Sequence, residues 1–168
     1  DALCRHPRIS KVTFTGSTAT GSSIMAACAT HGPKPVTLEL GGKSPQLVFA
    51  DIPDLHKTAR SVAMAITGNA GQVCVSGSRL IIERSILEPF VECLLGHFRE
   101  LRPGPTWSTQ TSLAPIISAL QAERIAAIVQ RSRQAGAELL AGGGRIDGLG
   151  GAYYPVSYTH LRAHETVL

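Results

Sequence analysis

The feature that most constrains the fold is a regular alternation of short strand patterns with helical patterns along the chain. Runs rich in β-branched and apolar residues are followed by stretches with apolar residues at helical spacing. Such alternation is typical of parallel strands joined by crossover helices. We therefore expect an α/β protein with a mostly parallel sheet. The predicted strands are residues 9–15, 35–40, 46–49 and 79–83, and the predicted helices are residues 17–30, 55–68, 85–101 and 118–135.

Two of the predicted helices carry specific boundary signals. Ser85 and Glu88 have the spacing of a capping box, in which the two side chains bond reciprocally to the first free backbone N–H groups of a helix. Gly136 follows the last periodic residue of the 118–135 pattern, where a glycine commonly ends a helix. Residues 102–111 hold two prolines and several hydroxyl residues, so we expect a loop there.

Composition excludes several classes of function. The chain has 168 residues and a net charge of +4 that is not gathered into a run of Lys and Arg, so binding to nucleic acid or to a membrane surface is not indicated. No stretch approaches the roughly 18 apolar residues of a transmembrane helix, and the first residues do not resemble a signal peptide. We therefore expect a cytoplasmic location. The length allows one ordinary domain or pieces of two.

The four cysteines lie far apart, without a Cys-x-x-Cys pair, which argues against a zinc ribbon, a thioredoxin-type motif and a disulfide framework. Cys28 and Cys93 lie within apolar helical patterns and are interpreted as small core residues. Cys74 differs because it lies among small residues in a predicted loop, where an electrophile could approach a thiolate. It is the candidate nucleophile, and Glu39, about 35 residues upstream, is its candidate base.

Residues 16–21 form a glycine-bounded segment that fails two nucleotide-binding motifs. It has the first and last glycine of a P-loop, but Ser22 and Ser23 follow where that motif needs Lys and then Ser or Thr. Thr18 also occupies the second glycine position of the Rossmann pattern. What remains is a helix N-terminus at Ser17, which either holds a phosphate or pyrophosphate or is an ordinary capped helix.

Three motifs, taken in order and spacing, resemble the aldehyde dehydrogenase superfamily. They are Phe-Thr-Gly-Ser-Thr-Ala-Thr-Gly (14–21), Leu-Glu-Leu-Gly-Gly-Lys-Ser-Pro (38–45) and Asn-Ala-Gly-Gln-Val-Cys (69–74). The similarity runs from about residue 3 to Pro155, which covers nearly the whole chain but only the middle of a family member. The resemblance implies an internal fragment. Residues 1–40 would be the end of a doubly wound, Rossmann-like NAD(P)-binding domain, and residues 41–156 the start of the α/β catalytic domain.

The resemblance also implies a cofactor and the residues that contact it. The helix beginning near Ser17 would lie beside the pyrophosphate of NAD or NADP, with the serine hydrogen-bonded to it. The substrate would be a small-molecule aldehyde, and family members are commonly homodimers or homotetramers. The cofactor-binding residues implied are Gly16, Ser17, Gly21 and Leu40.

Catalytic roles follow from the same resemblance. Cys74 would attack the aldehyde to give a thiohemiacetal and then a thioester, and its backbone N–H would supply one oxyanion donor. Glu39 would activate the water that releases the carboxylic acid, a role suited to a partly buried carboxylate. We expect the two side chains to face one cavity near the start of the helix at Ser17. The 168-residue chain alone is expected to be inactive, because half of the oxyanion hole and most cofactor contacts are missing.

The last residues, 157–168, depart from the family pattern and look similar to translated adaptor or vector sequence. His160 and His164 are four residues apart within this tail, but with no third ligand nearby a metal site is not predicted. The tail is assigned no function.

Two alternatives to an active dehydrogenase remain. One is a family member that keeps the fold without catalysis, and the other is a thiol hydrolase that pairs Cys74 with a histidine. Retention of both Glu39 and Cys74 favours the dehydrogenase, and none of the six histidines has a recognisable catalytic context.

Overall fold

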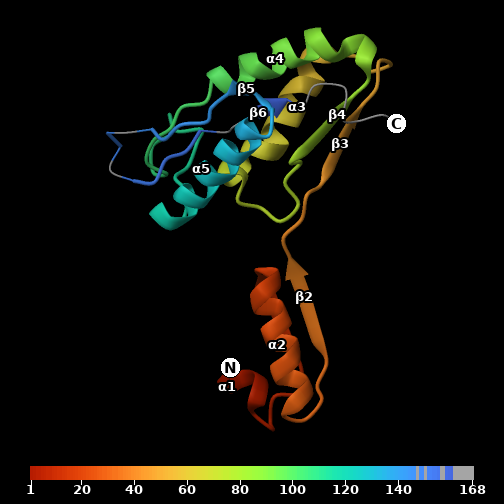
Figure 1. Cartoon of the computed structure of the whole chain (residues 1–168), viewed down its shortest axis with the longest axis vertical. Helices are drawn as coiled ribbons and strands as arrows, with labels where there is room; N and C mark the ends of the chain where they lie inside the picture. The colour runs from red at the N-terminus through yellow and green to blue at the C-terminus, as the bar shows by residue number, and fades with distance from the viewer. Residues whose placement is uncertain (147, 150, 156–157, 161–168) are drawn as a thin grey trace. The chain divides into compact units, whose positions relative to one another are not determined.

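The computed structural model describes residues 1–146, 148–149, 151–155 and 158–160 (Figure 1). The chain divides into two compact units. The first unit contains Asp1–Lys43 together with Val73–Val75, and the second contains Ser44–Gln72 and the described residues from Ser76 onward. Helices and parallel strand pairs occur in both units, which confirms the predicted α/β class.

The first unit is a strand, a crossover helix and a second strand. β1 (Val12–Gly16) pairs in parallel with β2 (Val36–Leu40), and α2 (Thr18–Thr30) connects them. Figure 1 shows α2 lying alongside β2. This arrangement confirms the predicted order of elements, and it follows because a parallel pair needs a long connection. A short helix, α1 (Ala2–Arg5), precedes β1.

Packing of α2 on β2 depends on Gly21, which is buried. A Cβ atom at this position would lie 2.9 Å from Leu40 Cδ2 and 3.3 Å from Leu38 Cδ1, so a larger residue would push the helix away from the strand. Cys28 lies on the same helix and is 1% exposed, which confirms its interpretation as a core residue. Cys4 of α1 is also buried.

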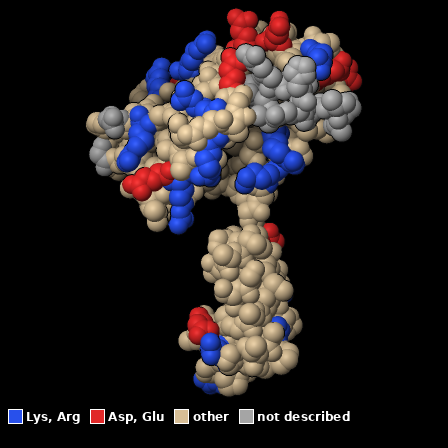
Figure 2. All heavy atoms as spheres, viewed as in Figure 1, with Lys and Arg blue, Asp and Glu red and all other residues tan. Residues whose placement is uncertain are grey.

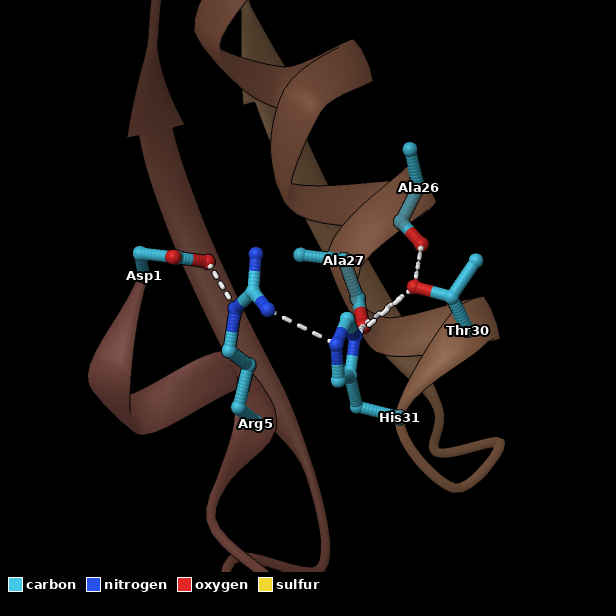
Figure 3. A network of polar contacts seen from close by, with 6 residues as sticks. All are labelled: Asp1, Arg5, Ala26, Ala27, Thr30 and His31. Carbon is cyan, nitrogen blue, oxygen red and sulfur yellow. Dashed lines mark hydrogen bonds and ion pairs between the residues drawn. The ribbon is translucent and has the colours of Figure 1, made fainter.

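A chain of polar contacts joins α1 to the end of α2 (Figure 3). Arg5 Nε binds Asp1 Oδ1 at 2.8 Å, and Arg5 Nη1 lies 2.8 Å from His31 Nε2. A guanidinium group only donates, so Nε2 accepts and the ring proton lies on Nδ1, which is 3.1 Å from the carbonyl oxygen of Ala27. Thr30 Oγ1 is 2.8 Å from the same Nδ1. These groups are exposed, so the network orients the chain end more than it stabilises the unit.

The second unit is built around β3 (Pro45–Val48) and β4 (Arg79–Ile82), which pair in parallel. Two helices, α3 (Leu55–Thr67) and α4 (Leu87–Arg99), pack against each other. Phe90 and Leu94 are 0% and 1% exposed and mark the centre of the core. Cys93 is half-buried against this core rather than fully inside it. The buried cluster consists of Val48, Ala59, Val62, Ala63, Phe90 and Leu94.

A second cluster forms around α5 (Ala119–Gln134), whose predicted position is confirmed. Ser118 caps the helix by accepting from the backbone N–H of Gln121, and Gly136 follows its end with φ of +95°. The next strand, β5 (Glu138–Ala141), pairs with β6 (Tyr158–His160) in the antiparallel sense, a pairing that the strand and helix alternation did not predict. The residues after His160, including His164, lie outside the described residues.

The capping box predicted at Ser85 and Glu88 is wrong. A 3-10 turn, η2 (Arg84–Ile86), precedes α4, and the N-cap of α4 is Ile86, which makes no side-chain cap hydrogen bond. Ser85 Oγ instead donates to Glu83 Oε1 at 2.8 Å, and Glu83 Oε2 accepts from the backbone N–H of Ala50 at 2.8 Å. The Ser85 hydroxyl is therefore bonded to the Glu83 carboxylate and does not accept from a backbone N–H of the helix, as a capping box requires. In the described part of the chain, no helix combines the length and apolar character needed to cross a membrane.

Candidate active site

The predicted site residues of the first unit meet at one edge of its sheet. Thr15 lies opposite Glu39, and Gly16 lies opposite Leu40, in the last register positions of β1 and β2. Ser17 follows Gly16 directly and is the N-cap of α2. The carboxyl ends of parallel strands are the usual place for ligands in α/β sheets. Strand register therefore brings Gly16, Ser17, Glu39 and Leu40 together at such an edge.

The N-terminus of α2 has free backbone donors. Ser17 Oγ accepts from the backbone N–H of Thr20 at 3.2 Å, and the N–H of Gly21 bonds to the Ser17 carbonyl oxygen at 2.9 Å. Helix geometry leaves the N–H groups of Thr18 and Ala19 without intrahelical acceptors. The first turn contains no acidic residue, and Figure 2 shows that most of the viewed surface of this unit lacks charged side chains. This helix end is therefore suited to an anion.

Gly21 and Leu40 contact each other rather than lying free at the edge. The absence of a side chain at Gly21 is explained by its close approach to Leu40 and Leu38. A Cβ atom on Gly16 would likewise collide with the ring of Phe14. These contacts account for both glycines through packing, and their predicted contact with a cofactor stays a prediction.

The two candidate catalytic side chains are both exposed in this chain. Glu39 lies near the end of β2, and Cys74 lies in a turn between α3 and β4, as expected of a loop cysteine. The segment Val73–Val75 belongs to the first unit, which also contains Glu39. The expectation of one shared cavity stays a prediction.

The backbone just before Cys74 is strained. Asn69, Ala70 and Gly71 have φ values of 50°, 54° and 75°, so three consecutive residues are left-handed within the short turn η1 (Gly68–Gly71). The left-handed region costs a residue with a side chain about 1–2 kcal/mol. Strain of this kind persists only where the surroundings hold it, and it gathers at functional sites. The strained turn therefore supports a functional role for Cys74 independently of the sequence motifs.

The segment after Cys74 is anchored by hydrogen bonds. Ser76 is 8% exposed, and its Oγ donates to the Gly71 carbonyl oxygen at 3.4 Å. The N–H of Gly77 bonds to the Ala65 carbonyl oxygen at 3.3 Å, and Gln46 Nε2 donates to the Gly77 carbonyl oxygen at 2.8 Å. Between these bonds and Gln72, the segment Val73–Val75 is exposed. Cys74 is thus presented by a short segment with fixed ends.

A cavity of about 570 Å³ lies in the second unit. Arg60, Asn69, His97 and Ser112 are among the residues that line it, and neither Glu39 nor Cys74 does. The proposed reaction site is therefore not assigned to this cavity.

The described residues hold a thiol and imidazole contact, but at another cysteine. Cys93 Sγ lies 3.4 Å from His56 Nδ1, between α4 and α3. Among the described residues, no histidine is hydrogen-bonded to Cys74, and no group of three or more His, Cys, Asp or Glu side chains could hold a metal ion. The hydrolase alternative, which needs a histidine base at Cys74, gains no support.

A family model described as "Aldehyde dehydrogenase family" matches residues 1–167. Among solved structures, the aldehyde dehydrogenase KauB from Pseudomonas aeruginosa superposes with a TM-score of 0.90 at 35% identity. A mutant of the indole-3-acetaldehyde dehydrogenase AldA from P. syringae, in complex with NAD+ and IAA, superposes with a TM-score of 0.90 at 36% identity. An NAD-dependent aldehyde dehydrogenase from Sinorhizobium meliloti gives 0.88 at 39% identity.

Coverage of these matches is unequal. Each superposition covers 94% of this chain but only 31–32% of the matched chain. The chain therefore spans about a third of the length of the solved structures that it matches.

Proposed function

The chain belongs to the aldehyde dehydrogenase family, and from that premise we propose that it is part of an NAD(P)-dependent enzyme that oxidises an aldehyde to a carboxylic acid. The observation that carries the proposal is the meeting of Gly16, Ser17, Glu39 and Leu40 at the carboxyl edge of one sheet. The grouping of Val73–Val75 with the same unit supports a role for Cys74 beside them.

In the proposed reaction, Cys74 is the nucleophile. Its thiolate attacks the aldehyde carbon, and the C=O electron pair moves to oxygen, giving a thiohemiacetal oxyanion. The backbone N–H of Cys74 donates one hydrogen bond to that oxygen. When the oxyanion collapses, the C–H electron pair leaves as hydride and a thioester remains on the sulfur. Exposure of Cys74 on a segment with fixed ends supports this role.

Glu39 is the proposed general base for the second half of the reaction. Its carboxylate takes a proton from water, the resulting hydroxide adds to the thioester carbon, and the Cys74 thiolate leaves as the carboxylic acid forms. The group is exposed in this chain, although a base of this kind is usually partly buried. In a whole family member, the remaining two thirds of the protein would shield the Glu39 carboxylate from solvent.

The cofactor we propose is NAD or NADP. When bound, it supplies the hydride acceptor. Ser17 and the N–H groups of Thr18 and Ala19 would hold its pyrophosphate, and the lack of an acidic residue in this first turn fits an anionic group. The structures of P. syringae AldA with NAD+ and of the NAD-dependent enzyme from S. meliloti favour NAD.

Further properties of the whole protein belong to the same proposal. Residues 1–40 form the end of the cofactor domain and residues 41–156 the start of the catalytic domain. The family match reaches residue 167, so it does not support the unrelated origin expected for residues 157–168. The whole protein acts as a homodimer or homotetramer in the cytoplasm. The free thiols Cys4, Cys28, Cys74 and Cys93 fit a reducing compartment.

The test is NADH or NADPH formation by a whole protein that carries this sequence, assayed with a panel of aldehydes. We expect Cys74→Ala to lower turnover by at least about a thousandfold, because no thiohemiacetal forms. Cys93→Ala is the matched control and should keep near wild-type activity. The 168-residue chain alone should be inactive. Full activity of Cys74→Ala would overturn the assignment, and dehydrogenase activity in the isolated chain would contradict its expected inactivity.

A further inference from the structure

Gln72 lies two residues before Cys74 and uses both ends of its side-chain amide. Its Oε1 accepts from the backbone N–H of Ile117 at 2.8 Å. Its Nε2 donates to the carbonyl oxygens of Asn69 at 3.1 Å and Pro115 at 3.3 Å. The half-buried side chain therefore links the turn before Cys74 to a segment more than forty residues downstream.

The orientation of this amide follows from its partners. A backbone N–H only donates, so the oxygen of Gln72 must face Ile117. Backbone carbonyl oxygens only accept, so the nitrogen must face Asn69 and Pro115. A flipped amide would break all three bonds. No other uncharged side chain of this length offers an acceptor and two donors at its end.

The same residue also closes the left-handed turn. The N–H of Gln72 bonds to the Asn69 carbonyl oxygen at 3.1 Å, and Asn69 Nδ2 donates to the Gln72 carbonyl oxygen at 3.3 Å. Asn69 and Ala70 are the two non-glycine residues with positive φ among the described residues. Main-chain and side-chain groups of Gln72 therefore hold the strained backbone at one end.

We propose that Gln72 is a positioning residue that fixes the Cys74 thiol, by tying the start of the exposed segment Val73–Val75 to Pro115 and Ile117. The proposal deepens the proposed function and rests on it. Ser76, buried and bonded to Gly71, fixes the other end of the segment. Gln72 acts through the backbone, since the hydrogen bonds of its side chain go to Asn69, Pro115 and Ile117 rather than to Cys74.

Position matters here because the sulfur must approach a carbonyl carbon along a narrow path. A displacement of about 1 Å can cost about a hundredfold in rate. With one end released, the three-residue segment would sample positions from which Cys74 cannot attack. Loss of Gln72 should therefore lower kcat more than it changes the KM for the cofactor, whose proposed contacts lie at the start of α2 and at the ends of β1 and β2.

Two variants distinguish the role of the amide oxygen of Gln72 from that of its amide nitrogen. Gln72→Met keeps the approximate length and removes every polar contact of the side chain. Gln72→Glu keeps an acceptor for the Ile117 N–H but places a charge against the carbonyl oxygens of Asn69 and Pro115. Gln130→Met is the matched control, because Gln130 is an exposed residue on α5.

The first measurement needs no variant. Ile117 is 84% exposed as a whole residue, yet its backbone N–H is bonded to Gln72. In the wild-type 168-residue chain we expect hydrogen exchange at this amide at least about tenfold slower than in an unstructured peptide. Exchange at the unstructured rate would overturn the proposal, whatever the enzyme assay shows.

The second measurement uses the variants. In the chain, Gln72→Met should accelerate exchange at Ile117 by at least about tenfold and change the rate of iodoacetamide labelling of Cys74 by at least about threefold, whereas Gln130→Met changes neither. In a whole active protein, both Gln72 variants should lower kcat by about ten- to a hundredfold with less than a twofold change in the KM for NAD.

The outcomes distinguish this proposal from the proposed function. If the wild-type whole protein oxidises no aldehyde but exchange and labelling change as expected, the proposed function fails and the role of Gln72 in holding Cys74 stands. If the wild type is active and the Gln72 variants match it in kcat and in labelling, the positioning role fails and the function stands.

Discussion

Thiol exposure differs sharply among the four cysteines. Cys74 is exposed, whereas Cys28 is 1% exposed and Cys4 is 5% exposed. Burial, together with the neighbouring Cys4 thiol, raises the pKa of Cys28, which further lowers its thiolate fraction. We expect iodoacetamide to label Cys74 at least about tenfold faster than Cys28, and faster than the half-buried Cys93. Mass spectrometry of timed samples measures these rates. Equal labelling of Cys74, Cys28 and Cys93 in folded protein would contradict the account.

Glu83 provides a pH-dependent contribution to stability. The N–H of Ala50, and secondarily the Ser85 hydroxyl, hold the pKa of Glu83 below its ordinary value of 4.5. A carboxyl whose pKa is lower in the folded state stabilises the fold above its unfolded pKa and loses that effect as pH falls through the folded pKa. Glu83→Gln should therefore lower the free energy of unfolding at pH 7, and the deficit should shrink below about pH 4.5.

Urea unfolding at several pH values tests this expectation. Glu92→Gln, at an exposed position of α4, is the control. A deficit in Glu83→Gln that stays constant between pH 7 and pH 3 would show that these hydrogen bonds do not favour the charged form.

Candidate site residues differed in how far they could be predicted. Gly16, Ser17, Glu39 and Leu40 were named from motifs, and their common edge follows from two strand patterns separated by one helix. Gln72 lies within the 69–74 motif but was given no role, because its partners Pro115 and Ile117 are distant in the sequence and only the folded chain brings them close. No local pattern around Gln72 signals that contact.

At the scale of elements, the turn before Cys74 is the most unusual feature. Gly71 has φ of +75°, and a Cβ atom there would lie 3.1 Å from the Ile66 carbonyl oxygen. Gly71→Ala should therefore lower the free energy of unfolding by about 1–2 kcal/mol. Gly68 lies three residues earlier, with φ of −51°. A Cβ atom there would have no neighbouring atom within 4 Å, so Gly68→Ala should change stability by less than about 0.5 kcal/mol.

Urea unfolding midpoints of the two alanine variants make the comparison. Equal effects at both positions would mean that the left-handed conformation of Gly71 is not retained in solution.

Helix positions were predicted more closely than helix caps. The patterns at 17–30, 55–68 and 118–135 correspond to α2, α3 and α5 to within about two residues at either end. The predicted cap of α4 was wrong because Glu83, which is not part of the capping-box pattern, accepts the hydrogen bond of the Ser85 hydroxyl. The antiparallel pairing of β5 with β6 was not predicted because it depends on contacts distant in sequence.

At the scale of the whole molecule, each of the two units contributes different groups to the proposed reaction. The first unit holds the helix end suited to an anion, together with Glu39 and Cys74. The second unit provides the anchors of the Cys74 segment, at Gln72 and Ser76. The family match spans residues 1–167, whereas the matched solved structures are about three times longer. The central claim is that Cys74 holds the acyl group and Glu39 activates the water that releases it.

The most direct test of that claim is rapid mixing of a whole protein carrying Glu39→Gln with an aldehyde and NAD. We predict a burst of about one NADH per active site followed by slow turnover, because the thioester forms normally and its hydrolysis is impaired. Mass spectrometry of the quenched protein should find the acyl group on the peptide containing Cys74. Absence of a burst in a folded variant, or an acyl group on any other residue, would contradict the claim.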